Sequence, residues 1–438
     1  MSQQAGWVRG ALVVAALVVV AAAPAGSAGF GIFEQGSQAM GMAGAFTAQA
    51  DDPSAIFHNA AGLAFFTERD IMVGTTLITN TETSFRGAAP FPGPGVTADQ
   101  ESVVFFPSHA YYVQPINERM TFGFGFFTPF GLATEWENPD TFPGRFISYE
   151  AELQSFDLTP NIGWRLTPNF GIGIGAIARA STVELNQRAG LVNPFANFAV
   201  VDIADVSLES DWEIGYGFQL GLLHRVNSSF SWGLSYRSQV DTDYAGEADF
   251  TQISTGIPQL DAVVAASLPF GAPVAVETGI DFPDMASLGL AFALSRNTTL
   301  EVDANWTGWS SFDTLVIDFD DARDRGSELD VERREEWDDA WNYRLGFAWR
   351  RPGGSEWRLG YVFDETPQPE RAAGPLLPDN DRNGFTVGYG SPRDGGMYWD
   401  VALMYLVFDE REVRESIDNF FGTYEQTAWL LGITVGWN

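Results

Sequence analysis

The chain has 438 residues, and its 57 Asp and Glu against 24 basic residues, all of them Arg, give a formal charge of −33. This balance excludes a nucleic-acid-binding protein that works through a basic face, because such proteins neutralise phosphates with clustered Lys and Arg. The absence of Cys excludes a disulfide framework and a cysteine nucleophile, and an apolar fraction of 45% is too high for a disordered acidic chain.

Residues 1–28 are typical of a bacterial secretory signal peptide. Arg9 precedes an apolar run over residues 11–23, and small residues at 25–28 suit a cleavage site. The run is shorter than the roughly 20 residues that a membrane-spanning helix needs. We therefore expect an exported protein whose mature chain begins near Gly29.

Residues 29–66 show no strand alternation and are rich in Gly, Ala and Ser, above all over residues 36–45. Small residues allow a segment to pack closely against other backbone. Two placements of this segment are possible. It is either a hatch inside a β-barrel, which the pattern of the following residues predicts, or a periplasmic tail. Glycines at 171, 173 and 175 fall on one face of a strand and would leave space for a hatch, so we expect the hatch.

From about residue 100 onward, apolar residues occupy every second position, which is the period of a β-strand. Residues 341–349, for example, carry Trp, Tyr, Leu, Phe and Trp at odd positions, and Asn, Arg, Gly and Ala at even positions. The aromatic face suits lipid and the other face a polar lumen. About fourteen such segments alternate with short and long connections, as in a bacterial outer-membrane barrel. The long connections are predicted at 80–101, 128–152, 182–210, 241–283, 310–339, 365–383 and 409–425.

The predicted fold class is all-β, a transmembrane antiparallel β-barrel of about 14 strands. It covers residues 67–438, and the hatch over residues 29–66 plugs its lumen. A plugged lumen argues against a general water-filled porin. Twelve Asp and Glu residues crowd the connection 310–339, and we interpret them as a solvated acidic surface rather than a dedicated site.

Catalysis and metal binding find little support in the sequence. Only three His occur, and no G-x-S-x-G or H-E-x-x-H pattern accompanies them. Residues 379–384 begin like a calcium loop, but Gly390 stands where a bidentate Glu is needed. We expect no enzyme activity, no metal site and no cofactor.

Motifs along nearly the whole mature chain occur in a specific order. They lie at residues 28–30, 50–63, 128–136 followed by 144–145, 307–312, 339–346 and 377–382. In content and order they closely resemble the outer-membrane long-chain fatty acid and hydrocarbon transporter family of the FadL/TodX type (OMPP1). One departure is Ala60, which stands in the place of the proline of the family's Asn-Pro-Ala-Gly hatch motif.

The resemblance implies passive transport. In the family, outer loops capture a hydrophobic ligand, a pocket in the barrel binds it, and it leaves sideways through a gap at a kinked third strand while the hatch shifts. The resemblance assigns hatch positions to Phe30, Asp51, Asp52, Asn59 and Gly62.

The sequence has a physical counterpart for this kink. Gly123 and Gly125 weaken strand packing, and Pro129 cannot donate a hydrogen bond to a ladder. We therefore predict that pairing fails near residues 127–130 and opens the wall there. Ordinary entry into a loop is the alternative.

Candidate ligand contacts fall into two groups. The apolar residues near the kink are predicted to capture ligand, with packing among the loops as the alternative; they are Phe127, Phe130, Leu132 and Trp136. A carboxylate headgroup would favour Arg. Strand parity points Arg179 and Arg344 inward, and Arg179 and Arg188 lie nearest the family's basic contact, but pairing with neighbouring acids is the alternative for each inward Arg.

We therefore expect an outer-membrane channel of a Gram-negative bacterium that takes up hydrophobic molecules, long-chain fatty acids first. A channel for aromatic or aliphatic hydrocarbons of the same family is one alternative. A structural or adhesive barrel with acidic binding loops is another. The expected partners are hydrophobic small molecules, outer-membrane lipid and lipopolysaccharide, and the barrel assembly machinery; the protein is expected to be a monomer without a nucleic-acid partner.

Overall fold

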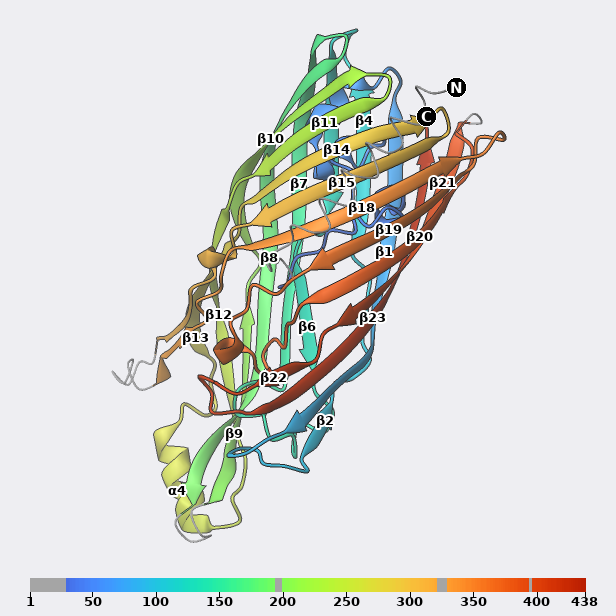
Figure 1. Ribbon diagram of the computed structural model, residues 1–438. Coiled ribbons are helices and arrows are strands. Elements are labelled where there is room, and N and C mark those ends of the chain that lie inside the picture. The colour runs from blue at the N-terminus through green and yellow to red at the C-terminus, as the bar shows by residue number, and fades with distance from the viewer. Residues whose placement is uncertain (1–28, 194–198, 321–328, 394–395) are drawn as a thin grey trace.

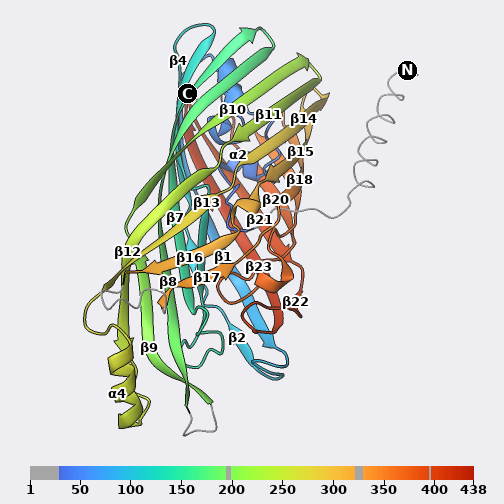
Figure 2. The same ribbon diagram turned by 90° about the vertical axis from the view of Figure 1, so that its left-hand side faces the viewer.

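The computed structural model describes residues 29–193, 199–320, 329–393 and 396–438, so the predicted signal peptide lies outside the described residues. Its strands form one closed antiparallel barrel of 14 strands (Figures 1 and 2). The barrel closes where β1 (Asp70–Gly87) pairs with β23 (Gly422–Trp437), from Ile71 opposite Trp437 to Gly87 opposite Gly422. The predicted fold class is confirmed.

Several barrel strands are divided into two consecutive elements. In chain order, with two elements of one strand joined by 'with', the first seven wall strands are β1, β3 (Val104–Phe105) with β4 (Ser108–Pro115), β5 (Met120–Phe127) with β6 (Gly131–Glu135), β7 (Glu150–Thr167), β8 (Phe170–Asn193), β9 (Ala199–Ser210) with β10 (Glu213–Asn227), and β11 (Phe230–Arg237) with β12 (Val240–Gln252). The next seven are β13 (Val274–Phe282) with β14 (Met285–Ser295), β15 (Thr298–Thr307) with β16 (Thr314–Phe319), β17 (Val331–Arg334) with β18 (Ala340–Arg350), β19 (Glu356–Asp364), β20 (Arg382–Gly390), β21 (Met397–Phe408) and β23. The connections carry β2 (Thr97–Asp99), α4 (Pro258–Ser267), η2 (Trp309–Ser311), η3 (Glu370–Ala372) and β22 (Arg411–Val413).

The strands extend further than the sequence pattern predicted. Residues 182–210 and 241–283 were expected to be loops, but β8, β9, β12 and β13 occupy most of them, with α4 at the tip (Figure 2). The prediction was wrong here because these extensions carry polar residues on their outer face, so they lack the aromatic side that marks lipid contact. Their inner face is apolar, as Val206, Leu208 and Val276 show.

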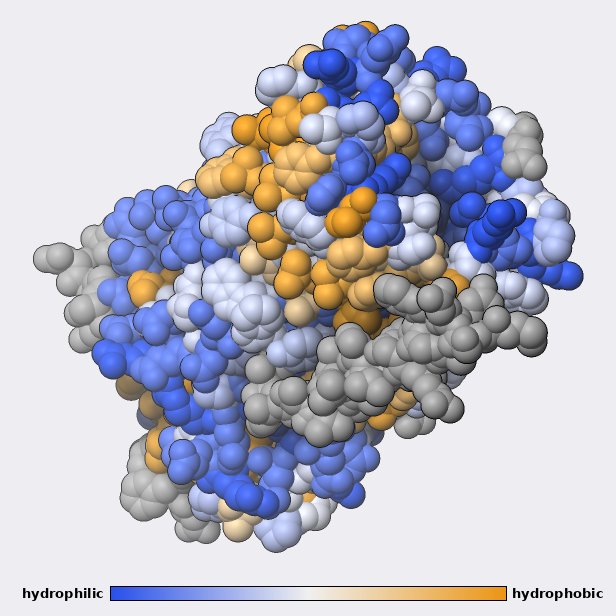
Figure 3. All heavy atoms as spheres, turned by 45° about the horizontal axis from the view of Figure 1, so that its top comes forward, coloured by the Kyte–Doolittle hydropathy of each residue, from blue (hydrophilic) through white to orange (hydrophobic). Residues whose placement is uncertain are grey.

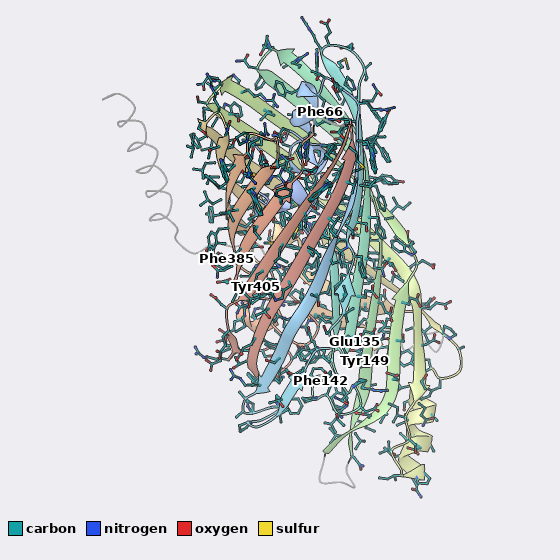
Figure 4. The ribbon with its side chains drawn as sticks, turned by 90° about the vertical axis from the view of Figure 1, so that its right-hand side faces the viewer. Phe66, Glu135, Phe142, Tyr149, Phe385 and Tyr405 are labelled. Carbon is teal, nitrogen blue, oxygen red and sulfur yellow. The ribbon has the colours of Figure 1, made fainter. Side chains whose placement is uncertain are left out.

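Apolar and aromatic side chains cover the outside of the wall. Trp341 and Trp349 are 40% and 47% exposed, as expected for residues that face lipid. In Figure 3 a band of apolar residues crosses the face shown, with hydrophilic residues on both sides of it. Figure 4 shows Phe66 near one end of the barrel, where the short turns lie, whereas Phe142 and Tyr149 lie toward the opposite end, where α4 projects. We call these the short-turn end and the long-loop end.

The N-terminal segment lies inside the barrel and carries α2 (Ser37–Met40), α3 (Ala55–His58) and η1 (Ala60–Phe65). No helix among the described residues is long and apolar enough to span a membrane. Inward glycines of the wall admit the segment, as predicted. A Cβ atom on Gly171 would come within 2.6 Å of Ala64, and one on Gly173 within 2.3 Å of Ala60. Gly175 instead makes room for the side chain of Asn161.

Two inward carboxylates of β15 hold the N-terminal segment. Asp303 accepts hydrogen bonds from the backbone N–H groups of Phe46 and Thr47, each at 3.0 Å. Glu301 accepts one from Ala48 N–H at 2.5 Å, and both carboxylates are fully buried. These bonds satisfy three consecutive backbone N–H groups of the plug, so β15 is a main anchor of the plug.

Replacing Asp303 by Ala should loosen the plug. It leaves two buried N–H groups without an acceptor, and each such group costs about 1–3 kcal/mol. We expect small-ion conductance in planar bilayers to rise above that of the parent protein, toward that of a variant without residues 29–63. Asp281→Ala, at an exposed position of β13, is the control. Parent-like conductance of the deletion variant would show that the segment does not seal the lumen.

Candidate functional site

The wall is interrupted between β5 and β6. Pairing of β5 with β7 is continuous through Gly123 and Gly125 and ends at Phe127 opposite Asp157. It resumes at Gly131 opposite Gln154. The break therefore coincides with Pro129, within the predicted range, whereas the two glycines lie in an intact ladder and make room for hatch side chains.

The first residues of the plug cover this break from the inside. Ile32 N–H donates to Pro129 O at 2.8 Å, and Gly131 N–H donates to Phe30 O at 3.0 Å. Ser155 Oγ on β7 donates to Phe130 O at 2.6 Å. The backbone groups that the kink frees are thus bonded to the plug and to the neighbouring strand, which couples the plug to the opening.

On its other edge, the kinked strand separates from β3 and β4. The ladder between β4 and β5 ends at Ala110 opposite Phe126, and contact resumes only where Glu101 N–H donates to Glu135 O at 2.8 Å. A cavity of about 510 Å³ lies along this opening. We call it the side cavity; its lining includes residues 103–107, Gly131 to Thr134, and charged side chains at Glu34, Arg344, Asp364, Asp379 and Arg382.

A second, smaller cavity of about 120 Å³ lies in the lumen. We call it the apolar cavity, because most of its lining is aliphatic or aromatic, from Ala151 and Leu153 of β7 to Ile280 and Ile317 of the opposite wall. Five residues line both cavities: Glu152 and four apolar ones, Phe30, Leu132, Leu153 and Leu377. These four side chains form a septum, in which Phe30 is the contribution of the plug.

Arg333 of β17 is the one basic residue in the described lining of the apolar cavity. Its guanidinium pairs with Glu335 and, at 2.5 Å, with Asp418 of the connection before β23. Burial raises the pKa of the Glu335 carboxyl, against the lowering effect of Arg333. Sequence reasoning missed Arg333 because it lies in the acidic connection 310–339. The only signal there was that Arg333 and Arg334 are adjacent among many acids.

The predicted capture residues lie deeper than expected. Phe127, Phe130 and Trp136 are at most 1% exposed, so the premise of an exposed apolar cluster does not hold for them. Phe130 packs against Phe30 with ring centroids 5.9 Å apart, and Trp136 stacks on Phe142 at 4.5 Å. Leu132 alone lines the cavities, and the capture role stays a prediction.

The three predicted headgroup arginines have different surroundings. Arg179 is buried and pairs with Asp157 at 2.8 Å. Arg188 pairs with Asp140 and Asp205 near the long-loop end. Arg344 lines the side cavity and donates to Ala43 O at 2.7 Å and to Asn342 Oδ1 at 2.8 Å. Among the described residues no carboxylate lies within 4 Å of its guanidinium nitrogens, so Arg344 is the candidate most open to an anion.

The predicted hatch residues all contact other parts of the plug or wall. Asn59 donates to Thr47 O and to Leu222 O of β10, and Gly62 approaches Ala50 O so closely that a Cβ atom would lie 2.2 Å from it. Asp52 is buried and accepts from Ser54, whereas Asp51 is exposed and accepts from Gln38 Nε2 at 2.8 Å.

The start of the plug is tied to a loop of the long-loop end. Gly29 N–H donates to Asp379 Oδ2 at 2.9 Å, and Thr366 also donates to this carboxylate. Burial raises the pKa of Asp379. The same residue lines the side cavity, so the N-terminal end of the plug, the loop and the cavity share one carboxylate.

A buried ion-pair layer lies beside the kink. Asp157, fully buried, pairs with Arg179 and with Arg237, each at 2.8 Å. Arg179 also lies over the ring of Phe130, 4.6 Å from its centroid. One carboxylate thus pairs with two buried cations next to the residues that the plug covers, and the three side chains together carry a net positive charge.

Comparisons with known proteins agree over nearly the whole chain. A family model described as "Outer membrane protein transport protein (OMPP1/FadL/TodX)" matches residues 18–438. The chain is 25% identical over 450 residues to a long-chain fatty acid transport protein of Salmonella typhi, covering 99% of this chain and 98% of that protein. A Pseudomonas aeruginosa FadL homologue has a similar fold, with a TM-score of 0.79, 19% identity and 94% and 99% coverage. The Pseudomonas putida toluene transporter TodX also has a similar fold, with a TM-score of 0.72 and 16% identity, covering 92% of this chain and 98% of that chain.

Replacing Asp157 by Ala should destabilise the barrel strongly. Removing one partner of a buried ion pair costs about 3–5 kcal/mol, because the opposite charge stays buried without compensation. We expect the free energy of unfolding in lipid vesicles, followed by tryptophan fluorescence, to fall by about this amount. Asp318→Ala, at an exposed position of β16, should change it little. Equal stability of the two variants would contradict a structural role for the layer.

Proposed function

Because the chain belongs to the OMPP1/FadL/TodX family of outer-membrane transport proteins, we propose that it takes up hydrophobic molecules passively, and that long-chain fatty acids are its preferred ligands. The observation that carries this proposal is the apolar cavity with a single basic lining residue, Arg333. An apolar pocket serves any hydrophobic molecule, but a guanidinium at its wall favours a carboxylate.

The size of the cavities supports a ligand that spans both of them. Ligand pockets commonly hold about 300–1,000 Å³, and the apolar cavity, about 120 Å³, is too small for a long alkyl chain. The side cavity, about 510 Å³, lies beyond the septum. We propose that the carboxylate sits at Arg333 and that the chain displaces Phe30 and reaches the side cavity.

The kink supports a lateral exit. The side cavity lies along the opening between β4 and β6, and Phe30 and Ile32 of the plug are bonded to the kink. A shift of residues 30–32 would open the septum and release the kink together. We propose residues 29–66 as the hatch, residues 67–438 as the barrel, and Arg344 as a second anion contact on the way out.

Arg333→Gln tests the ligand class. Loss of a charge-assisted hydrogen bond of about 1.5–3 kcal/mol should weaken palmitate binding to the purified protein about tenfold to a hundredfold. Binding of toluene, which has no charge, should stay the same. Arg334→Gln is the matched control, because this neighbouring side chain is 68% exposed. Equal palmitate affinity of both variants and the parent would refute a headgroup role of Arg333.

Gly131→Leu tests the lateral exit. A Cβ atom on Gly131 would lie 3.1 Å from Ile32 Cδ1, and a larger side chain would enter the side cavity. We expect cellular uptake of palmitate to fall severalfold while the affinity at the apolar cavity changes little. Gly353→Leu, in a turn with nothing within 4 Å of its Cβ position, is the control. Unchanged uptake by Gly131→Leu would argue for exit by another route.

A further inference from the structure

A second interruption of the wall lies between β10 and β12. The ladder between β10 and β11 ends at Gln219 opposite Arg237, and the next rung on this edge is Gly246 opposite Ser210. Two contacts delimit the interval: Ser238 N–H donates to Phe218 O at 2.9 Å, and Asp211 N–H donates to Ala245 O at 2.8 Å. Between them, residues 213–217 and 240–244 have no ladder pairing with each other in the described wall. We call this interval the seam.

Side-chain packing and one buried hydrogen bond, between Tyr244 of β12 and Ser181 of β8 at 2.6 Å, close the seam in place of a ladder. Val240 is fully buried, and its two methyl groups occupy the space that side chains at Gly215 and Gly217 would need. A Cβ atom on Gly217 would lie 2.8 Å from Val240 Cγ2. Separating two fully paired strands breaks a ladder hydrogen bond at about every residue, whereas opening the seam over residues 213–217 breaks none.

The seam separates the apolar cavity from the outer surface. Tyr244, Gly246 and Ser210 line the apolar cavity on the inside. On the outside, Ile214, Tyr216 and Phe218 of β10 are 47–74% exposed and form an apolar surface, whereas the facing strand β12 exposes the carboxylates of Asp241 and Asp243. Moving Val240 and Tyr244 away would therefore connect the lumen with the apolar surface of β10, beside the two exposed carboxylates of β12.

The long-loop end of the seam carries negative charge on its outer side. A surface cavity of about 280 Å³ lies there, and its described lining contains four carboxylates and no basic residue. Glu152 lies directly opposite Glu184, and Glu184 directly opposite Glu209; Asp211 is the fourth. The surface cavity and the apolar cavity share Val183, Ser210 and three of these acids, so little wall separates them.

We propose that the seam is a second side portal, distinct from the kink, which passes uncharged apolar molecules between the lumen and the outer surface of the wall. Asp211 at its outer rim, together with Asp241 and Asp243 on the outer face of β12, repels an ionised fatty acid, because like charges raise each other's energy at short range. Uncharged molecules meet no such barrier. The inference rests on the proposed transport function and adds a route selected by ligand charge.

A disulfide across the seam tests the portal. The parent has no Cys, so Gly217→Cys with Val240→Cys provides the only thiol pair. In cells that depend on this channel, oxidation should lower toluene uptake severalfold, leave palmitate uptake unchanged, and be reversed by reductant. The control cross-link is Leu222→Cys with Leu234→Cys, at directly opposite residues of β10 and β11. The Gly217→Cys single variant under the same oxidant controls for the substitution.

Val240→Ala provides the opposite perturbation and does not depend on disulfide formation. Removing the closing methyl groups should raise toluene uptake severalfold and leave palmitate uptake as it is. Toluene uptake unaffected by either change, or toluene and palmitate uptake lowered equally by the cross-link, would overturn the portal. If the parent itself takes up neither probe, the proposed function fails and the portal with it. If the parent takes up both probes and the cross-link changes neither uptake, only the portal fails.

Discussion

Pairing of backbone groups in lipid is the constraint on which this structure depends. Hydrocarbon offers no hydrogen-bond partner, so a strand that spans it must be paired on both edges. The closure of β1 on β23 meets this demand at the ends of the chain. Each place where the ladder stops needs another solution, and the kink and the seam differ in theirs: plug backbone bonds cover the kink, and close packing at glycines seals the seam.

The lumen uses charge in a complementary way. Inward acids such as Asp303 accept backbone N–H groups of the plug, and inward arginines such as Arg344 donate to its carbonyl groups. The plug thus needs few charged residues of its own, and its small residues can lie directly against wall glycines. The absence of Lys is partly accounted for inside the barrel, because a guanidinium can serve a carboxylate and an aromatic ring at once, as Arg179 does with Asp157 and Phe130.

The sequence predicted the parts of this molecule that lipid dictates. Alternation of aromatic and polar residues identified the closed wall, and the inward glycines 171 and 173 correctly indicated a segment inside it. The extensions beyond the lipid were missed, because their outer faces are as polar as loops. The cavities could not be predicted either: Phe127 and Phe130 have the composition of a capture site, but their burial depends on plug contacts far away in sequence. Arg333 gained its position from the pairing of β16 with β17, a register that composition does not determine.

The order of elements along the chain has a consequence for how the barrel is assembled. The plug precedes β1, and β1 pairs with the last strand, so the wall becomes a closed ring only when the final strand arrives. Once that ring has formed, residues 37–65 would have to pass a rim already bounded by paired strands to reach their seats. Entry before or during closure avoids this passage, because the bonds to β15 can then form while the wall is still open.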